Sequence, residues 1–419
     1  EAARRSAEIT SEERSVDLEA LGDALFLAGR SAEASDAYRE ALRTGPGSPF
    51  REAHLALKLA RVEQRRGRYA VALRRASLGL RALKGIDSAQ ARAARARLQA
   101  RYAVCRVSQG RYADARRWAQ RAVVDAEAAG ELDALAQAHL VLHTVDLWSA
   151  DPEGERHGAT ALRLFEQLGD LGGQAHALNN LAMRRLFEGR WPDALPMFAQ
   201  AAETFRRVGD ATNAANSTYN RADVLVRQGR FDEAWPLLNE TLRIARAVDD
   251  EELVALVLKE QGRARSRAGD VDEGLELLGI ARARLLDLGE PHEVVDTDVA
   301  AAEAHLLAGR PKQALALIET ALSEAKSLQA ATLLPSAHRV HAAALFASGV
   351  LAPARSTLAE GLRYSSSPDV GHERAFLLAV AARIAQHDQD ADASRLEQEA
   401  RTALQSLGVV RVPLPESAG

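Results

Sequence analysis

The sequence predicts an all-α fold: an α-solenoid of about ten helical hairpins with a 40-residue period, wound as a right-handed superhelix. One observation is a glycine that returns at a constant interval, at Gly189, Gly229, Gly269, Gly309 and Gly349. Another is that apolar residues at helical spacing stand on both sides of each glycine. A fixed period of this length is typical of stacked repeats that bury their apolar faces against their neighbours.

The same turn occurs earlier in the chain with less even spacing, at Gly29, Gly67 and Gly110. Continuing the constant interval in both directions places two degenerate turns near Ser149 and Gln389, both in segments that contain aspartate, which also favours turns. These two turns bring the number of expected hairpins to ten.

The segment around Gly189 illustrates one hairpin. The apolar positions of its first helix are Leu178, Leu181 and Leu186, and those of its second helix are Ala194, Phe198 and Ala201. These spacings place each set on one helix face. A glycine between the two helices is expected because a residue that ends a helix and reverses the chain often needs a positive φ.

Small residues recur at two fixed offsets from the turn. Seven positions before it stand Gly22, Ala60, Ala103, Ala182, Ala222, Gly262, Ala302 and Ala342. Five positions after it stand Ala34, Ala72, Ala115, Ala194, Ala234, Gly274, Ala314 and Ala354. This pattern resembles the tetratricopeptide repeat over almost the whole chain, although that repeat is shorter, at about 34 residues, and has a closing proline. The extra residues of each unit add about 9 Å of helical rise.

We expect repeats over residues 1–148, a degenerate turn and possible hinge over 149–158, further repeats over 159–407, and a non-helical tail over 408–419. Pro152 and two glycines crowd the hinge segment. The chain starts at Glu1 without a methionine and its repeats begin almost at once, so we expect it to be part of a larger protein.

Composition indicates an ordinary soluble protein. The formal net charge is −4, which gives no reason to expect direct binding of nucleic acid or of a membrane, and no long apolar run is present. The single Cys105 excludes an internal disulfide framework and fits a reducing compartment, so we expect a cytoplasmic protein.

Catalytic and metal-binding motifs are absent, and we expect no cofactor and no metal. The pairs His139 with His143 and His338 with His341 have helical spacings that could place two imidazoles on one face, but neither pair has further ligands in sequence.

An acidic segment has the ligand spacing of a calcium loop. Its candidate ligands are Asp388, Asp390, Asp392, Ser394 and Glu399. Ala393 stands where such a loop requires glycine, so a simple turn is the better interpretation.

The first helix of each hairpin is expected to line a concave groove that binds a protein or peptide partner. Its candidate residues are Asn179, Met183, Tyr219, Asp223, Arg227, Lys259, Arg263, Arg267, Glu303 and Arg339. For any one of them a solvated helix face is the plainer interpretation. The carboxylate clamp of some tetratricopeptide proteins is broken here by Met183, Leu256 and Glu260.

Longer segments carry a closer resemblance. Residues 18–23, 60–69, 108–115, 176–181 and 187–191 are similar to the C-terminal repeat region of bacterial, especially actinobacterial, class III adenylate/guanylate cyclases fused to a signalling ATPase. This resemblance implies that repeats sense a partner and control attached ATPase and cyclase domains, which would carry any catalysis.

The sequence therefore favours a non-catalytic regulatory scaffold. Three alternatives stay open. Similar arrays also end ATP-dependent transcription regulators, a purely architectural homo-oligomer would use its outer helices, and a self-sufficient enzyme would need a cluster of titratable groups beside a nucleophile.

Overall fold

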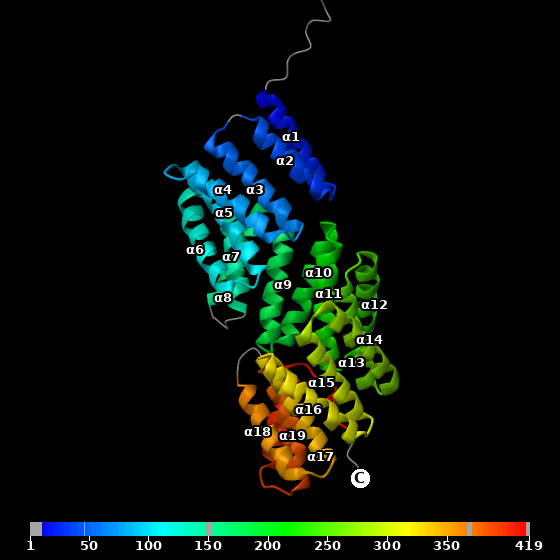
Figure 1. The fold of residues 1–419 in the computed structure, drawn as a ribbon. Helices are drawn as coiled ribbons and strands as arrows, with labels where there is room; N and C mark the ends of the chain where they lie inside the picture. The colour runs from blue at the N-terminus through cyan, green and yellow to red at the C-terminus, as the bar shows by residue number, and fades with distance from the viewer. Residues whose placement is uncertain (1–10, 46, 148–152, 367–370, 416–419) are drawn as a thin grey trace, which may run out of the picture. The chain divides into compact units, whose positions relative to one another are not determined.

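The computed structural model describes residues 11–45, 47–147, 153–366 and 371–415. Over these residues the chain forms twenty α-helices and one short 3-10 helix, with no strand (Figure 1). Consecutive helices pair as antiparallel hairpins, from α1 with α2 to α19 with α20. This is the all-α solenoid of helical hairpins that the regular glycine spacing predicts.

The chain divides into two compact units, Glu1–Ala177 and Leu178–Gly419, and the division falls inside α9. The N-terminal unit contains α1 (Ser11–Leu27), α2 (Ser31–Thr44), α3 (Pro49–Arg65), α4 (Tyr69–Ala82), α5 (Ala89–Val107), α6 (Tyr112–Ala129), α7 (Leu132–Leu147), α8 (Glu153–Leu168) and the start of α9 (Leu171–Phe187).

The C-terminal unit contains the rest of α9 and the helices that follow it. They are α10 (Trp191–Arg207), α11 (Ala211–Gln228), α12 (Phe231–Ala247), α13 (Glu251–Ala268), α14 (Val271–Leu288), α15 (Pro291–Leu307), α16 (Pro311–Ser327), η2 (Ala331–Leu333), α17 (Leu334–Ala347), α18 (Leu351–Tyr364), α19 (Glu373–His387) and α20 (Ala393–Ser406).

The turns lie where the period places them. All eight predicted turn glycines have positive φ, for example +71° at Gly189 and +69° at Gly309. Gln389, the predicted degenerate turn, also has a positive φ of 57°. Ser149 lies outside the described residues and Glu153 already begins α8, so the hinge over 149–158 stays a prediction.

The small residues on either side of each turn allow the two helices of a hairpin to approach closely. Ala194 and Ala314 are fully buried. In the hairpin of α13 and α14, both positions are glycine: a Cβ on Gly262 would lie 2.8 Å from the carbonyl oxygen of Gly274. Even a methyl group would therefore push these helices apart, which explains why the repeat that lacks alanine has glycine on both sides.

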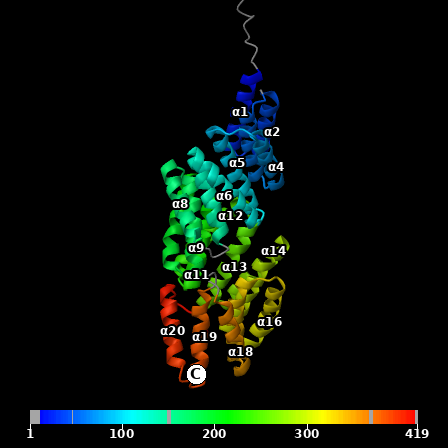
Figure 2. The same cartoon turned by 90° about the vertical axis from the view of Figure 1, so that its left-hand side faces the viewer.

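The last hairpin of the C-terminal unit, α19 and α20, packs against α9, α10 and α11 at the start of the same unit. Phe376 of α19 and Leu404 of α20 share a buried cluster with Trp191 and Phe198 of α10. Figure 2 shows α19 and α20 side by side at the end of the chain. The C-terminal unit is therefore held together by contacts between its two ends as well as between neighbouring repeats, which a simple open array lacks.

The tail after α20 continues this contact. The side-chain amide of Gln228, at the end of α11, donates a hydrogen bond to the carbonyl oxygen of Leu407 (2.8 Å). The backbone N–H of Val410 donates to the carbonyl oxygen of Gln228 (2.8 Å). From Gly408 to Pro415 the tail has no helix. It is an extended segment that fastens the last hairpin to α11.

Among the described helices, none combines the length and the apolar character that crossing a bilayer requires.

Candidate partner-binding site

The repeat period sets the register of charged side chains on the first helices of the C-terminal hairpins. Asp223 of α11, Arg263 of α13 and Glu303 of α15 occupy the same position in three successive repeats. Because stacked helices bring equivalent positions together, this register places a cation between two carboxylates.

These side chains belong to a set of neighbouring ion pairs, which we call the ion network. Its members are Asp223, Arg227, Lys259, Glu260, Arg263, Arg267, Glu293, Asp296, Glu303, Arg339 and Glu373. They come from α11, α13, α15, α17 and α19, five first helices that Figure 1 shows within the C-terminal unit. The charge of Arg263 also acts on Asp223 and Glu303, which links the neighbouring pairs electrostatically.

The α13–α15 part of the network centres on Asp296. Its carboxylate accepts hydrogen bonds from Lys259 Nζ (2.7 Å) and from Arg263 Nη2 (2.9 Å). Lys259 also contacts Glu293 (2.6 Å), and Arg263 also contacts Glu260 (2.8 Å). Each cation is thus held by at least two carboxylates.

The α15–α19 part centres on Glu303. Arg267 donates to its carboxylate from Nε (2.6 Å), and Arg339 Nη2 lies 2.9 Å from it. Arg339 Nε in turn donates to Glu373 of α19 (3.2 Å). The network therefore extends from α11 to the last hairpin of the C-terminal unit.

The centre of the network is buried, whereas Asp223, Arg227, Arg267, Glu293 and Asp296 are partly exposed. Lys259, Glu260, Arg263 and Glu303 are 4%, 1%, 6% and 3% exposed. The expected groove residues do come together, but in this structure they pair with one another instead of facing an open channel. Any ligand that bound them would have to replace these internal partners.

Neighbouring cations hold three of the network carboxylates, Asp296, Glu303 and Glu373, in their charged form by lowering their pKa. Burial by itself raises the pKa of Glu303, but the charges of Arg267 and Arg339 outweigh it and lower that pKa to about 2. Burial likewise opposes ionisation of Asp296, and Arg263 and Lys259 reverse the effect and hold its pKa well below the ordinary range. Glu260 is the exception: burial raises its pKa despite Arg263.

Two buried polar atoms at the site lack a hydrogen-bond partner among the described residues: Glu260 Oε2 and His372 Nδ1. His372 lies immediately before α19, and its ring centroid is 5.4 Å from that of Trp191. Burial lowers the pKa of His372 to about 4, so it is neutral at pH 7. Orphaned groups of this kind mark places where a ligand could add a hydrogen bond.

The remaining predicted residues lie beside the network. The Asn179 side-chain oxygen accepts a hydrogen bond from Ser217 Oγ (3.0 Å). Met183 packs against the cluster that joins α10 to α20, and Tyr219 packs against the core of α11 to α13. Burial raises the pKa of Tyr219 well above its ordinary value.

Sequence reasoning missed four network carboxylates. They are Glu260, Glu293, Asp296 and Glu373. One signal was available: Glu293 and Glu373 stand two periods apart and so share a register. Glu260 pairs with Arg263 of its own helix, α13, and Asp296 joins the network only through the packing of α13 against α15.

The histidine pairs do not converge. His139 Nδ1 lies 2.9 Å from Nδ1 of His157, while His143 Nδ1 contacts the carbonyl oxygen of Gly154 (2.7 Å). His338 and His341 face different carboxylates, Glu360 and Glu319. Within the described residues no group of three potential metal ligands gathers at one point.

The acidic segment near Gln389 forms a turn and the start of α20. Asp388 pairs with Arg355, whereas Asp392 and Glu399 both pair with Arg395 (3.1 Å and 2.8 Å). Asp390 accepts a hydrogen bond from the backbone N–H of Asp392 (3.0 Å). These carboxylates point to arginines and backbone, which matches the interpretation as a simple turn.

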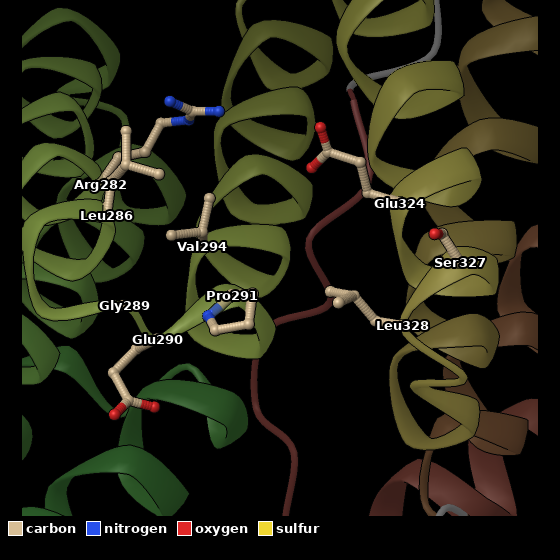
Figure 3. A pocket seen from close by; sticks show the side chains of 9 residues that line it. All are labelled: Arg282, Leu286, Gly289, Glu290, Pro291, Val294, Glu324, Ser327 and Leu328. Atoms are coloured by element: carbon tan, nitrogen blue, oxygen red, sulfur yellow. The ribbon is translucent and has the colours of Figure 1, made fainter.

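A separate pocket of about 460 Å³ lies among α14, α15 and α16 (Figure 3). Figure 3 shows Val294, Pro291 and Leu328 in its interior, with Arg282 and Glu324 on opposite sides. Arg282 already pairs with Asp298 (2.6 Å). None of the ten predicted site residues lines this pocket, so it is distinct from the ion network.

Comparison with protein families places tetratricopeptide repeats in two segments of the chain, residues 2–49 and 174–281. One tetratricopeptide-repeat model matches residues 174–247 and 213–281, and a second matches residues 2–49. A comparison with curated proteins gave no match.

Solved structures with the same kind of fold cover most of the chain. A Rap protein complexed with competence and sporulation factor shares 13% identity at a TM-score of 0.56, over 94% of this chain and 98% of that one. Aspartyl phosphate phosphatase F from Bacillus subtilis shares 11% identity at a TM-score of 0.57, over 87% and 97%.

A third structure is a signal transduction ATPase with numerous domains and a tetratricopeptide repeat sensor, from Pyrococcus horikoshii. It shares 14% identity at a TM-score of 0.57 over 85% of this chain, and the matched region spans 53% of that protein. Together these findings show tetratricopeptide repeats over residues 2–49 and 174–281, and an α-solenoid fold shared with solved repeat structures over most of the chain.

Proposed function

We propose that this chain is a non-catalytic regulatory scaffold and that the first helices of its C-terminal unit bind an extended segment of a partner protein. The observation that carries the proposal is the ion network, which has members on five successive first helices. The Rap protein of similar fold is complexed with competence and sporulation factor, which supports a partner-binding role for this fold.

The network is suited to an exchange of partners. It contains five cations and six carboxylates, so a peptide that carries both signs of charge can replace several internal partners at once. Buried ion pairs are close to break-even in free energy because desolvation offsets much of their attraction. A closed, self-paired form and a ligand-paired form can therefore be similar in free energy, and a ligand that prefers one form shifts the population.

The test is selection from a random peptide-display library on the whole chain, followed by calorimetric titration of the selected peptides. Tyr219→Ala and Arg263→Ala change the predicted site, and Arg284→Ala is the control because its pair with Glu251 is exposed. We expect at least tenfold weaker binding by the two site variants and unchanged binding by the control. Selected peptides that bind all three variants equally would place the binding surface elsewhere.

We also propose that the chain acts as the sensor of an attached signalling ATPase or cyclase. Its fold similarity to the repeat sensor of the archaeal ATPase supports this role. The coding sequence upstream of Glu1 tests this proposal, and we expect it to encode an ATPase or a cyclase. An ATPase with a DNA-binding domain there would instead favour the repeat sensor of an ATP-dependent transcription regulator. A stable homo-oligomer in light scattering, with contacts on second helices, would instead favour an architectural scaffold.

A further inference from the structure

The N-terminal unit contains a strongly basic region that the overall charge of the chain conceals. From Arg51 to Arg121, across α3 to α6, nineteen residues are Lys or Arg and only four are Asp or Glu, although the whole chain has a formal net charge of −4. Such a local excess creates a positive potential that attracts anions.

Many of these cations have carboxylate partners. Arg51 and Lys58 pair with Glu19, and Arg97 pairs with Glu131. A second group has no ion pair among the described residues, and it includes Arg74 and Arg81 of α4 and Arg106 of α5. No carboxylate among the described residues pairs with these three arginines.

These three arginines line one cavity of about 690 Å³ between α4 and the end of α5. The polar side chains beside them are Ser77, Tyr102 and Gln109, and leucine and alanine side chains complete the wall. None of the nine described residues that line it is acidic. Arg74 and Arg81 are two helical turns apart, with Ser77 between them on the same face.

Neutral groups hold the guanidinium of Arg106 in place. Its Nη1 donates to Gln109 Oε1 (2.9 Å) and its Nη2 donates to Tyr102 Oη (3.0 Å), while its Nε is buried without a partner among the described residues. The cation is thus oriented without being neutralised. An arginine held in this way is ready to bind an oxyanion, because its planar fork matches the geometry of phosphate oxygens.

The acidic residues of the neighbouring helices are engaged elsewhere. Glu63 of α3 accepts a hydrogen bond from Ser35 Oγ (2.6 Å), Asp114 of α6 pairs with Arg111 (2.5 Å), and Asp125 of α6 pairs with Arg95 (3.4 Å). None of the three belongs to the cavity lining.

The aromatic ring in the cavity does not offer a platform for a nucleobase. The ring of Tyr102 is already covered: Trp118 packs against it with ring centroids 4.3 Å apart, and the Arg106 guanidinium lies 5.2 Å from the Tyr102 centroid. Single-stranded nucleic acids depend on stacking of bases on exposed aromatic faces. The lining is therefore better suited to a phosphate group than to a base.

We propose that this cavity binds a phosphate monoester, a dianion that Arg74, Arg81 and Arg106 neutralise together. The volume lies within the range typical of small-molecule sites and exceeds what a free phosphate needs, so the phosphate is carried by a larger group. Ser77 and Gln109 supply neutral hydrogen-bonding groups for that carrier. The site is independent of the ion network and of the partner proposed for it.

The experiment titrates the whole chain with three probes: inorganic phosphate, sn-glycerol 3-phosphate, and a phosphoserine hexapeptide beside its unphosphorylated form. Calorimetry reports affinity, and tryptophan fluorescence reports the combined environment of the four tryptophans, of which Trp118 contacts Tyr102 in the cavity wall. Binding by glycerol phosphate alone identifies a small ester as the ligand, and preferential binding of the phosphopeptide identifies a modified side chain.

Arg74→Gln is the variant and Arg75→Gln is the matched control, since Arg75 is the next residue on α4 and does not line the cavity. We expect the first to weaken phosphate-ester binding at least tenfold and the second to change it less than twofold. Both variants are compared by thermal melting, and Arg81→Gln provides a second exposed lining position with the same expected loss.

Four results would overturn the proposal. Equal losses of phosphate-ester affinity in Arg74→Gln and Arg75→Gln would show that the probes are attracted by the overall positive charge of the region and do not bind at a defined site. Measurable binding of both peptides with equal affinity, or no binding of any probe at millimolar concentration, would exclude recognition of a phosphate group. Tighter binding of a single-stranded oligonucleotide, lost in Arg74→Gln, would make nucleic acid the ligand.

Discussion

Replacing Glu303 by glutamine tests whether the ion network stabilises the C-terminal unit. Glu303 is 3% exposed and its carboxylate is shared by Arg267 (2.6 Å) and Arg339 (2.9 Å). The substitution keeps the shape and removes the charge. Arg339 retains Glu373, but no second carboxylate pairs with Arg267 among the described residues.

The magnitude follows from the pKa of Glu303, which is lowered from 4.5 to about 2. At about 1.4 kcal/mol per pKa unit, ionised Glu303 stabilises the folded state by about 3 kcal/mol at pH 7. Breaking a buried ion pair typically costs ~3–5 kcal/mol, so the two routes agree. Because the folded pKa is the lower one, this contribution is present above pH 4.5 and is lost as the pH falls toward 2.

The assay is urea denaturation of the whole chain followed by circular dichroism, at pH 7 and at steps down to pH 3. Glu276→Gln is the control, because Glu276 is an exposed glutamate on α14. We expect Glu303→Gln to lose about 3 kcal/mol at pH 7 and the difference from the native chain to shrink below pH 4.5. A loss under about 1 kcal/mol at pH 7, or a loss that does not depend on pH, would refute the assignment of buried charge pairing to Glu303.

Two pairs of glycine substitutions test the packing, and one histidine substitution tests the effect of burial on a pKa. Gly229→Ala places a Cβ 2.6 Å from Arg411 Cβ and strains a φ of +79°. We expect it to lower folding stability by more than the ~1–2 kcal/mol of backbone strain expected for Gly309→Ala, where the added Cβ has free space. Equal melting temperatures of the two variants would contradict the contact between the tail and α11. We expect Gly262→Ala to destabilise the α13–α14 hairpin and Gly279→Ala, with nothing within 4 Å of the added Cβ, to stabilise α14 by ~0.5–1 kcal/mol. Urea midpoints of the two variants test this, and midpoints that shift in the same direction would contradict it. Burial lowers the pKa of His372 from 6.5 to about 4, so as the pH falls through that interval the unfolded state binds a proton that the folded state does not, and the folded state loses stability. His372→Gln should therefore reduce the loss of stability between pH 7 and pH 4.5 by about 2–3 kcal/mol. An unchanged loss of stability would exclude His372 as its cause.

Local sequence features were enough to predict the hairpins. The glycine at each turn and the small residue on either side of it affect only the backbone next to them. The turn at Gly309 and the close helix contact at Ala314 can therefore be predicted from a few residues. The same holds for Gln389, where the period locates a turn without a glycine.

The candidate site was predictable only in part. Arg263 and Glu303 follow from register because equivalent positions of stacked repeats face one another. Asp296 does not follow, because it joins Lys259 and Arg263 through the packing of α13 against α15. The basic cavity was hidden for another reason: a net charge summed over the chain averages away the excess around Arg74 and Arg106.

The sequence by itself determined the period, the hairpin and the solenoid class, because each depends on contacts within a repeat or between neighbours. The tertiary structure decided what the first helices of the C-terminal unit face. Contacts between Gln228 and Leu407, 179 residues apart, bring α20 and the tail onto α11. Pairing between Arg339 and Glu303 then buries charges that an open array would leave in water. No local pattern specifies such contacts, because they depend on how small rotations accumulate over many repeats.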